Sequence, residues 1–471
     1  MANADAPRLF GTDGVRGTAG RYPLDRATVR RLGAALVRAL PRGADVGLAD
    51  AGRVLSDPAD IADRAPHFLI GRDTRESGDW IEAELAHGAS GAGAVVTSVG
   101  VVPTPAVAYL TRTGPFDAGV VISASHNPYE DNGIKVFSHQ GEKFTERVER
   151  DVEAIVADAS WQARSGEPGP VTRTDLVGAY LDHLRGVLPD PSALRAVPFR
   201  LAVDCANGAT TDVAPRLFRD LGFDTVVIGN QPDGRNINLQ CGSTHPEALA
   251  RVVVDRGCRM GVAFDGDGDR AIFVDERGRV VDGDAVLFMC ARQLQREGRL
   301  KGEAIVATVM SNIGLELALR PLGIALVRCA VGDKYVMEEM IARGLSLGGE
   351  QSGHIIFSDY LFTGDGLCTA LNVIRTVLVT ARPLGDLASD LVTYPQVLLN
   401  VRVREKVDLQ SVPSVAAAMA NVEARVEGRG RLLVRYSGTE PLLRVMLEGQ
   451  DQGEIRRWAQ EIVDVVKREI G

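Results

Sequence analysis

The chain has 471 residues, a formal net charge of −9 at pH 7, and 45% hydrophobic and 24% charged residues. These proportions exclude disordered and collagen-like chains, and the length predicts several domains, because single domains span roughly 50–250 residues. The acidic balance argues against broad binding to nucleic acid or anionic membranes, which requires a basic surface. Glycine is over-represented, at 51 residues, which indicates many tight turns or backbone that approaches a ligand closely.

The sequence carries no sign of membrane insertion or disulfide bonding. No apolar run reaches the roughly 20 residues of a membrane span, and the first ten residues lack the basic start and apolar core of a signal peptide. The six cysteines are widely spaced and form no CxxC pair, so neither a zinc site nor a disulfide framework is expected. We therefore predict a cytoplasmic protein whose cysteines are reduced and mostly buried.

The first predicted elements alternate between short β-branched strands and helical segments, a pattern typical of βαβ units. One helix is expected from about residue 79, and another with Thr104 as N-cap and Pro105 as its first residue. Residues 42–66, rich in alanine and aspartate, predict a surface excursion of loop and short helix, to which we assign no function. The predicted strands are residues 67–70, 94–99 and 118–123.

Two further α/β series and a different tail follow along the chain. The second series predicts strands at 199–204, 225–228 and 261–264 and helices near 213–221 and 246–256. The third predicts helices near 284–295, from 312 and near 334–342, and strands at 304–308 and 325–329. The tail predicts strands at 398–403, 431–436 and 442–448, a helix near 412–421, and a final helix that buries Ile455, Trp458, Ile462 and Val466. It is therefore expected to form a smaller α+β domain.

The most concentrated anionic feature is DGDGDR, residues 265–270. In extended chain Asp265, Asp267 and Asp269 share one face, and the intervening glycines let the backbone bend around an ion. Carboxylates held together repel unless a cation neutralises them, and hard oxygen ligands favour Mg²⁺ or Ca²⁺. A calcium loop of the EF-hand type fits poorly, because Arg270 stands where that loop needs glycine and the flanks are strand-like. The other alternative is an acidic turn between strands.

A candidate nucleophile follows an apolar strand in SASHNP, residues 123–128, at the strand end where α/β folds place their ligands. Strand alternation does not decide whether Ser123 or Ser125 points into the site. Ser125, next to His126, is a candidate nucleophile or phosphate carrier, and Lys135 would offset negative charge there. Taken alone, the segment also fits a polar turn.

Three other motifs set polar groups beside glycine. GTDGVRG, residues 11–17, places Arg16 as an anion-binding loop would, and GEQSGH, residues 349–354, suits sugar hydroxyls and proton transfer. In RYSGTEPLLR, residues 435–444, two arginines bracket backbone and hydroxyl donors, which suits bidentate phosphate binding. Each also fits an ordinary turn, but together the motifs predict phosphoryl transfer on a phosphorylated sugar. Because no GxxxxGK[ST] loop is present, the phosphoryl donor is expected to be stored on the protein.

These five motifs, in this order over nearly the whole chain, resemble those of the α-D-phosphohexomutase superfamily. GEQSGH with Gln351, beside GTDGVRG, is most similar to the bacterial phosphoglucosamine mutases within it. The resemblance implies an α/β fold: three related mixed or parallel-sheet α/β domains plus a smaller C-terminal α+β domain around a central cleft. The expected domains carry the phosphoserine loop, the metal-binding loop, the sugar-recognition loop and the phosphate-binding loop, in residues 1–165, 166–278, 279–390 and 391–471.

The resemblance also implies roles for individual residues. Ser125 would be phosphorylated in the active enzyme, and Arg270 would help hold the phosphoryl group. Beyond the resemblance, we expect Arg16 to orient the phosphoserine, and Lys135 and His354 are our candidates for proton transfer. One Mg²⁺ per active site would be held by Asp265, Asp267, Asp269 and an oxygen of phospho-Ser125. Sugar hydroxyls and the phosphate that is not transferred would be bound by Glu350, Ser352, Arg435, Ser437, Gly438, Thr439 and Arg444.

The implied reaction interconverts glucosamine 6-phosphate and glucosamine 1-phosphate through a hexosamine 1,6-bisphosphate that also serves as activator. It would feed the synthesis of UDP-N-acetylglucosamine and cell-wall precursors. Phosphomannomutase or phosphoglucomutase activity is the alternative within the superfamily, and a non-catalytic phosphosugar-binding protein or a metal-dependent phosphatase are alternatives from other classes. The expected partner is a small phosphosugar, with neither nucleic acid nor membrane, and a homodimer is compatible with the resemblance.

Overall fold

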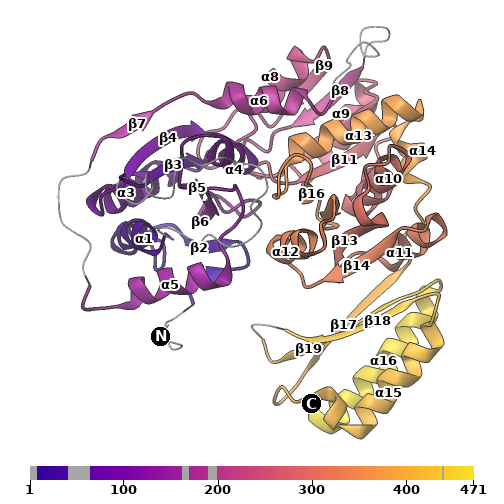
Figure 1. Ribbon diagram of the computed structural model, residues 1–471. Coiled ribbons are helices and arrows are strands. Elements are labelled where there is room, and N and C mark those ends of the chain that lie inside the picture. Colours follow the sequence, from indigo (N-terminus) through magenta and orange to yellow (C-terminus); the bar gives the residue numbers. More distant parts are fainter. Residues whose placement is uncertain (1–7, 41–63, 162–168, 189–198, 438–439) are drawn as a thin grey trace. The chain divides into compact units, whose positions relative to one another are not determined.

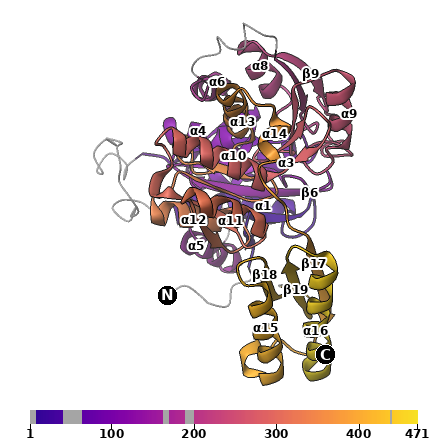
Figure 2. The ribbon, with the colours of Figure 1, turned by 90° about the vertical axis from the view of Figure 1, so that its right-hand side faces the viewer.

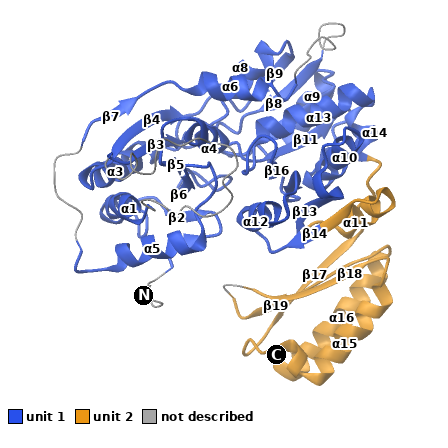
Figure 3. Cartoon of the chain, in the orientation of Figure 1, with its two compact units in different colours: residues 1–309, 327–388 blue, residues 310–326, 389–471 orange. Residues whose placement is uncertain are grey.

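The computed structural model describes residues 8–40, 64–161, 169–188, 199–437 and 440–471. The chain divides into two compact units, of which unit 1 holds residues 1–309 and 327–388 and unit 2 holds residues 310–326 and 389–471 (Figure 3). No helix in the described ranges is long and apolar enough to span a membrane. All six cysteines are buried and carry free thiols, as predicted.

The first sheet of unit 1 has seven strands in the order β1-β2-β6-β5-β3-β4-β7 (Figure 1). The neighbours β5, β3, β4 and β7 run parallel, whereas β6 pairs antiparallel with both β5 and β2. The strands are β1 Phe10–Gly11, β2 Gly14–Thr18, β3 His67–Arg72, β4 Val95–Val101, β5 Ala118–Ile122, β6 Asp131–Ser138 and β7 Val171–Arg173. The associated helices are α1 Arg26–Ala39, α3 Gly78–Gly91, α4 Thr104–Thr113, α5 Glu146–Ala157 and α6 Val177–Arg185.

One core of this layer forms where α1, α3 and α5 meet alternate residues of the strands. Phe68 and Ile70 of β3 join this cluster, as expected because successive strand side chains point to opposite faces. α1 and α3 approach each other at Gly33 and Gly88, where an added Cβ would meet the backbone of the other helix. This close packing fixes the helical layer behind the strands that lead to the site.

The second sheet has the order β12-β11-β10-β8-β9, with β8 parallel to β9 and β10. β10 and β11 are antiparallel and pair Phe264 with Ala271, so the DGDGDR segment is the connection of a β-hairpin. The elements are β8 Arg200–Asp204, α8 Val213–Asp220, β9 Asp224–Ile228, α9 Glu247–Asp255, β10 Met260–Phe264, β11 Ala271–Asp275 and β12 Val280–Val281.

The third sheet has the order β14-β13-β15-β16 and carries the GEQSGH segment between its antiparallel strands β15 and β16. Its strands are β13 Ala304–Thr308, β14 Ala325–Cys329, β15 Leu347–Gly349 and β16 Ile355–Phe357. The helices are α10 Gly283–Arg296, α12 Asp333–Arg343, α13 Gly366–Thr380 and α14 Leu384–Ala388, with the short turns η1 Lys301–Glu303 and η2 Arg320–Leu322 and the helix α11 Ile313–Leu319 between strands.

Unit 2 is built on an antiparallel sheet in the order β17-β19-β18, against which α15 and α16 pack side by side (Figures 1 and 2). Ile455, Ile462 and Val466 of α16 are buried in its core, and Trp458 packs partly buried against the same cluster, as predicted. The elements are β17 Gln396–Arg402, η3 Leu409–Ser411, α15 Pro413–Val426, β18 Arg431–Tyr436, β19 Leu442–Glu448 and α16 Gln452–Ile470.

The structure confirms the predicted fold class of mixed sheets with helices and a smaller α+β tail. The predicted N-cap is wrong by one residue: Pro103 precedes α4, and the Thr104 hydroxyl donates to Asp267 instead of capping the helix. β7, at Val171–Arg173, extends the first sheet beyond residue 165. The four domain boundaries and the excursion at 42–66 stay predictions, and residues 42–63 of that excursion lie outside the described residues.

Candidate active site

Ser125 lies in the turn after β5 and is almost completely buried. Its Oγ donates a hydrogen bond to Asp265 Oδ2 at 2.5 Å, and His126 Nδ1 lies 3.4 Å from the same Oγ. The Ser123 hydroxyl instead donates to Asp73 Oδ2 at 2.6 Å and accepts the Ser125 N–H at 2.9 Å. The serine that faces the acidic loop is therefore Ser125, a choice that strand alternation left open.

The three aspartates of the β10–β11 hairpin are buried, and one ligand oxygen from each lies within 4.8 Å of the others. Asp267 Oδ2 accepts hydrogen bonds from Thr104 Oγ1 at 2.5 Å and from Lys135 Nζ at 2.7 Å, and Lys135 Nζ also donates to Asp269 Oδ2 at 2.9 Å. Within the described part of the chain, Oδ1 of Asp267 and Oδ1 of Asp269 are buried and make no hydrogen bond. Because buried carboxylate oxygens are costly without a partner, this cluster could bind a metal ion.

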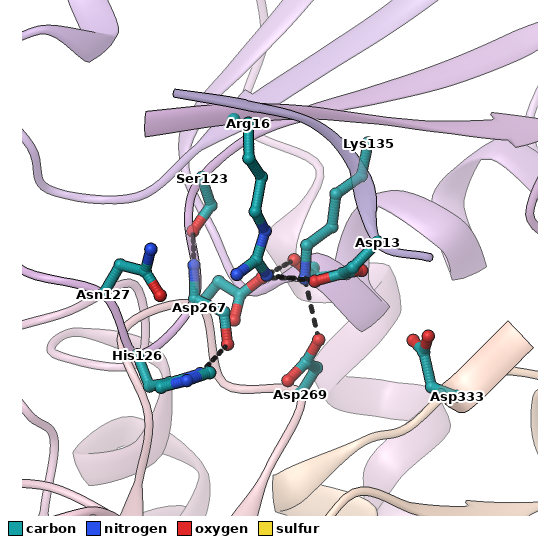
Figure 4. A network of polar contacts seen from close by, with 12 residues as sticks. Asp13, Arg16, Ser123, His126, Asn127, Lys135, Asp267, Asp269 and Asp333 are labelled. Atoms are coloured by element: carbon teal, nitrogen blue, oxygen red, sulfur yellow. Dashed lines mark hydrogen bonds and ion pairs between the residues drawn. The ribbon is translucent and has the colours of Figure 1, made fainter. Parts of the chain in front are cut away.

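The pKa shifts within the cluster indicate that its negative charge exceeds its positive charge. Burial, together with Asp269 and Asp267, raises the pKa of Asp265 well above its usual range. Burial alone would lower the pKa of Lys135, but Asp13, Asp267 and Asp269 raise it well above its usual value. Lys135, which lies on β6, is therefore an ammonium at neutral pH, and its side chain lies among the carboxylates of Asp13, Asp267 and Asp269 (Figure 4).

A chain of ion pairs leads from Lys135 to the third sheet. Lys135 Nζ lies 3.2 Å from Asp13 Oδ2, Asp13 Oδ1 lies 2.5 Å from Lys143 Nζ, and Lys143 also pairs with Asp333 at the start of α12. The sequence reasoning missed Asp13, Lys143 and Asp333. For Asp13 a signal existed, because it shares a glycine-flanked motif with Arg16, with which it forms an ion pair.

His354 is buried and faces the same acidic loop. Its Nε2 accepts the Gly364 N–H at 3.0 Å, which assigns the ring proton to Nδ1. Nδ1 lies 3.7 Å from Asp269 Oδ1, and Nε2 lies 3.6 Å from Asp333 Oδ2. Burial alone would lower the pKa of His354, but Asp269, Asp333 and Glu350 raise it above its usual value. The imidazole borders both the acidic cluster and the ion-pair chain.

Two arginines lie near His126, the neighbour of Ser125: Arg270 follows the acidic loop, and Arg16 lies on strand β2. The Arg270 N–H donates to Asp265 Oδ1 at 3.1 Å, and its Nη1 lies 3.2 Å from His126 Nδ1. Burial, Arg270 and Arg16 lower the pKa of His126 to about 4, so its imidazole is neutral at pH 7. Among the described residues, Nε of Arg16 and Nε of Arg270 are buried and make no hydrogen bond. These donors suit an anionic oxygen beside Ser125.

The GEQSGH turn presents its acid and hydroxyl together. Glu350 Oε1 accepts the Gly332 N–H at 3.2 Å, and Ser352 Oγ lies 3.4 Å from Glu350 Oε2. Gln351 is held differently, because its Nε2 donates to Asp282 Oδ2 at 3.0 Å. Glu350 and Ser352 thus remain the polar pair of this turn, within the same compact unit as Ser125.

The remaining predicted residues belong to unit 2. Arg435 on β18 and Arg444 on β19 are directly opposite in register and therefore share one face of the sheet. Ser437 closes the turn with its N–H donated to the Leu442 carbonyl at 2.8 Å. Like charges placed opposite each other destabilise a sheet unless an anion compensates them, which fits a phosphate site. Gly438 and Thr439 lie outside the described residues.

Comparisons with known proteins find relatives along the full chain. A phosphoglucosamine mutase of Solibacter usitatus is 50% identical over 471 residues, 99% of this chain and 100% of the relative. One from Geobacter sp. strain M21 is 44% identical over 468 residues, 98% of each chain. A solved phosphoglucomutase/phosphomannomutase family protein from Burkholderia thailandensis is 23% identical with a TM-score of 0.77, covering 98% of this chain and 97% of that chain. Sequence models of phosphoglucomutase/phosphomannomutase α/β/α domains I, II and III and of its C-terminal domain match residues 49–163, 178–278, 282–394 and 398–465.

Proposed function

The chain belongs to the phosphoglucomutase/phosphomannomutase family, and on that premise we propose that it interconverts glucosamine 6-phosphate and glucosamine 1-phosphate. It is an isomerase that works by phosphoryl transfer. The observation that carries the proposal is the Ser125 hydroxyl, hydrogen-bonded to one of three buried aspartates, two of which keep an oxygen without a hydrogen bond among the described residues. A nucleophile beside an anionic cluster of this kind suits a phosphoryl group paired with a metal ion.

Ser125 is the proposed phosphoryl carrier. Asp265, Asp267, Asp269 and an oxygen on Ser125 would hold one Mg²⁺, which carboxylate oxygens suit. When bound, the ion supplies positive charge that offsets the charge on the transferring phosphoryl oxygens. Arg16 and Arg270 would orient the same oxygens, since each has a buried Nε donor that makes no hydrogen bond within the described ranges.

The phosphoryl group moves twice in the proposed cycle. The bond between phosphorus and Ser125 Oγ breaks as the sugar 1-hydroxyl of glucosamine 6-phosphate attacks, giving the 1,6-bisphosphate. The sugar then turns end for end, and its 6-phosphate returns a phosphoryl group to Ser125. His354 is the candidate acceptor for the hydroxyl proton when its imidazole is neutral, and Lys135, held as an ammonium, is the candidate donor.

Substrate binding completes the proposal. Glu350 and Ser352 would read sugar hydroxyls, while Arg435, Ser437, Gly438, Thr439 and Arg444 would hold the phosphate that is not being transferred. We assign the four domains to residues 1–165, 166–278, 279–390 and 391–471. A cytoplasmic location and a homodimer remain predictions, and the product would supply UDP-N-acetylglucosamine and cell-wall precursors.

Side-by-side rates separate this function from its alternatives. We expect kcat/KM for glucosamine 1-phosphate to exceed that for glucose 1-phosphate and mannose 1-phosphate by about tenfold or more, because a missing polar contact is worth at least that factor. Release of inorganic phosphate should be slower than isomerisation. Equal or faster turnover of the hexose phosphates would favour phosphoglucomutase or phosphomannomutase activity, and faster phosphate release would favour a phosphatase.

A further inference from the structure

Arg75 lies in the turn between β3 and α3, and its side chain is completely buried. Each of its five guanidinium N–H groups has an acceptor. Nε donates to Asp73 Oδ2 at 2.9 Å, and Nη1 and Nη2 each donate to two backbone carbonyls. An ammonium has only three donors, so lysine cannot make this set. The four carbonyls belong to Pro128, Asp131 (3.0 Å), Ser125 (3.0 Å) and Asn127 (2.9 Å).

Asp73 connects the same arginine to the other side of Ser125. Its Oδ1 accepts the Arg75 N–H at 3.0 Å, and its Oδ2 accepts the Ser123 hydroxyl at 2.6 Å. The Ser123 oxygen then accepts the Ser125 N–H at 2.9 Å. The carbonyl of Ser125 is therefore held by Arg75, and its amide is held by Asp73 through Ser123.

Ser125 needs this support because of its backbone conformation. Its φ of +53° lies in the left-handed region, which non-glycine residues adopt only where the surrounding structure imposes it. Asn238 Nδ2 adds a second donor to the Ser125 carbonyl at 2.9 Å. No hydrogen bond of the described residues joins Arg75 or Asp73 to Ser125 Oγ, which leaves the hydroxyl to face Asp265.

We propose that Arg75 and Asp73 are positioning residues for phosphoryl transfer, which hold the left-handed backbone of Ser125 so that Oγ stays aimed at the acidic cluster. The inference rests on the proposed function, because it assigns these residues to the same reaction. A reacting atom misplaced by about 1 Å can slow a transfer by about 100-fold. Loss of the hydrogen bonds from Arg75 and Asp73 should therefore lower kcat and leave substrate binding unchanged.

The test uses the full chain with Mg²⁺, after incubation with glucosamine 1,6-bisphosphate as phosphoryl donor and quantification of phospho-Ser125 by intact mass. Ser123→Ala removes a single link, and we expect kcat to fall about tenfold with KM within about twofold of the wild-type value. Arg75→Lys should lower kcat about 100-fold. The loss in the double variant should be smaller than the product of the two single losses, because Asp73 links Arg75 and Ser123 in one hydrogen-bond network.

Arg30→Gln is the matched control. Arg30 donates Nε and Nη2 to Glu84 Oε2 on α3, in the same layer but away from the Ser125 turn. We expect this variant to keep kcat within about twofold of the wild-type value.

The possible outcomes separate the two claims. A wild-type chain inactive on glucosamine phosphates would refute the proposed function, and the positioning role with it. An active wild type would refute the positioning role alone if Ser123→Ala and Arg75→Lys kept their kcat, if only KM changed, or if the two losses multiplied in the double variant. If Arg75→Lys does not fold, Ser123→Ala decides, because it deletes only one hydroxyl.

Discussion

The charges of single residues near Ser125 determine whether the acidic cluster needs a bound cation. Lys135 shares its ammonium among Asp13, Asp267 and Asp269, all within 3.2 Å of Nζ. Asp13 also pairs with Arg16 and Lys143. Asp267 and Asp269 are buried, and Oδ1 of each makes no hydrogen bond within the described residues. A divalent cation would add positive charge there, so Lys135 and a bound metal ion would stabilise the same loop.

Replacement of Lys135 tests this shared role. Lys135→Met should destabilise the protein by about 3–5 kcal/mol in EDTA, because removing one partner leaves buried charge uncompensated. Millimolar Mg²⁺ should then raise the melting temperature of the variant more than that of the wild type. Differential scanning calorimetry with and without Mg²⁺ measures both effects, and Lys467→Met, on the exposed side of α16, is the control. An unchanged melting temperature in EDTA would contradict the account.

Sequence reasoning located the chemistry of the site better than its geometry. The aspartates of DGDGDR and Lys135 were proposed from residue type and position, and Ser125 was proposed from the resemblance. Strand alternation left the choice between Ser123 and Ser125 open, because that choice depends on a left-handed φ at Ser125. Asp73 and Arg75 were missed because their partners lie about 50 residues away in the chain, where no local pattern records them.

At the scale of elements, strands were easier to locate than their pairing. DGDGDR and GEQSGH both connect antiparallel neighbours, β10 with β11 and β15 with β16, although the alternation of strands and helices predicts mainly parallel sheet. The β6 strand that carries Lys135 was not predicted, since DNGIKVF begins with residues typical of turns. Antiparallel connections between neighbouring strands therefore carry the acidic loop and the GEQSGH turn, and the sequence did not reveal this pairing.

Helix capping gives a pH prediction. Asp365 caps α13, where Oδ1 accepts the Cys368 N–H at 2.9 Å and Oδ2 accepts the Tyr180 hydroxyl at 2.9 Å. Burial raises the pKa of Asp365 from 3.8 to about 6. The native state therefore binds this proton more tightly than the unfolded chain, and its stability falls as pH rises from about 4 to about 6. Asp365→Asn should remove this pH dependence. Between pH of about 4 and about 6, the free energy of unfolding of the variant should therefore rise relative to that of the wild type by up to about 3 kcal/mol.

Urea unfolding of the Asp365→Asn variant at several pH values checks the sign. Asp25, the N-cap of α1, provides the opposite case, because burial is outweighed there by hydrogen bonds from Thr28 and the pKa of Asp25 is lowered. Asp25→Asn should therefore lose stability relative to wild type as pH rises toward about 4, and its relative stability should stay constant above that pH. A parallel pH response of the two variants would contradict the assignment for Asp365.

For the whole molecule, the alternation of strands and helices was enough to predict the fold class. It did not reveal that the three α/β layers belong to one compact unit or that residues 310–326 belong with the C-terminal unit. Such groupings depend on contacts between distant segments, such as the Lys143–Asp333 ion pair between the first and third layers. The net charge of −9 is compatible with an anionic substrate, because arginines and a bound cation can make one site locally positive.

The most direct measurement is a single turnover of the chain phosphorylated on Ser125, mixed with equimolar glucosamine 6-phosphate and Mg²⁺ and quenched at intervals. Mass analysis of the Ser125 peptide should show its phosphate appearing in glucosamine 1,6-bisphosphate at least as fast as kcat. Ser125→Ala should carry no phosphate and lose about 10³-fold or more in kcat, whereas Ser90→Ala should behave as wild type. Full activity of Ser125→Ala, or a phosphate that stays on the protein during turnover, would contradict the account.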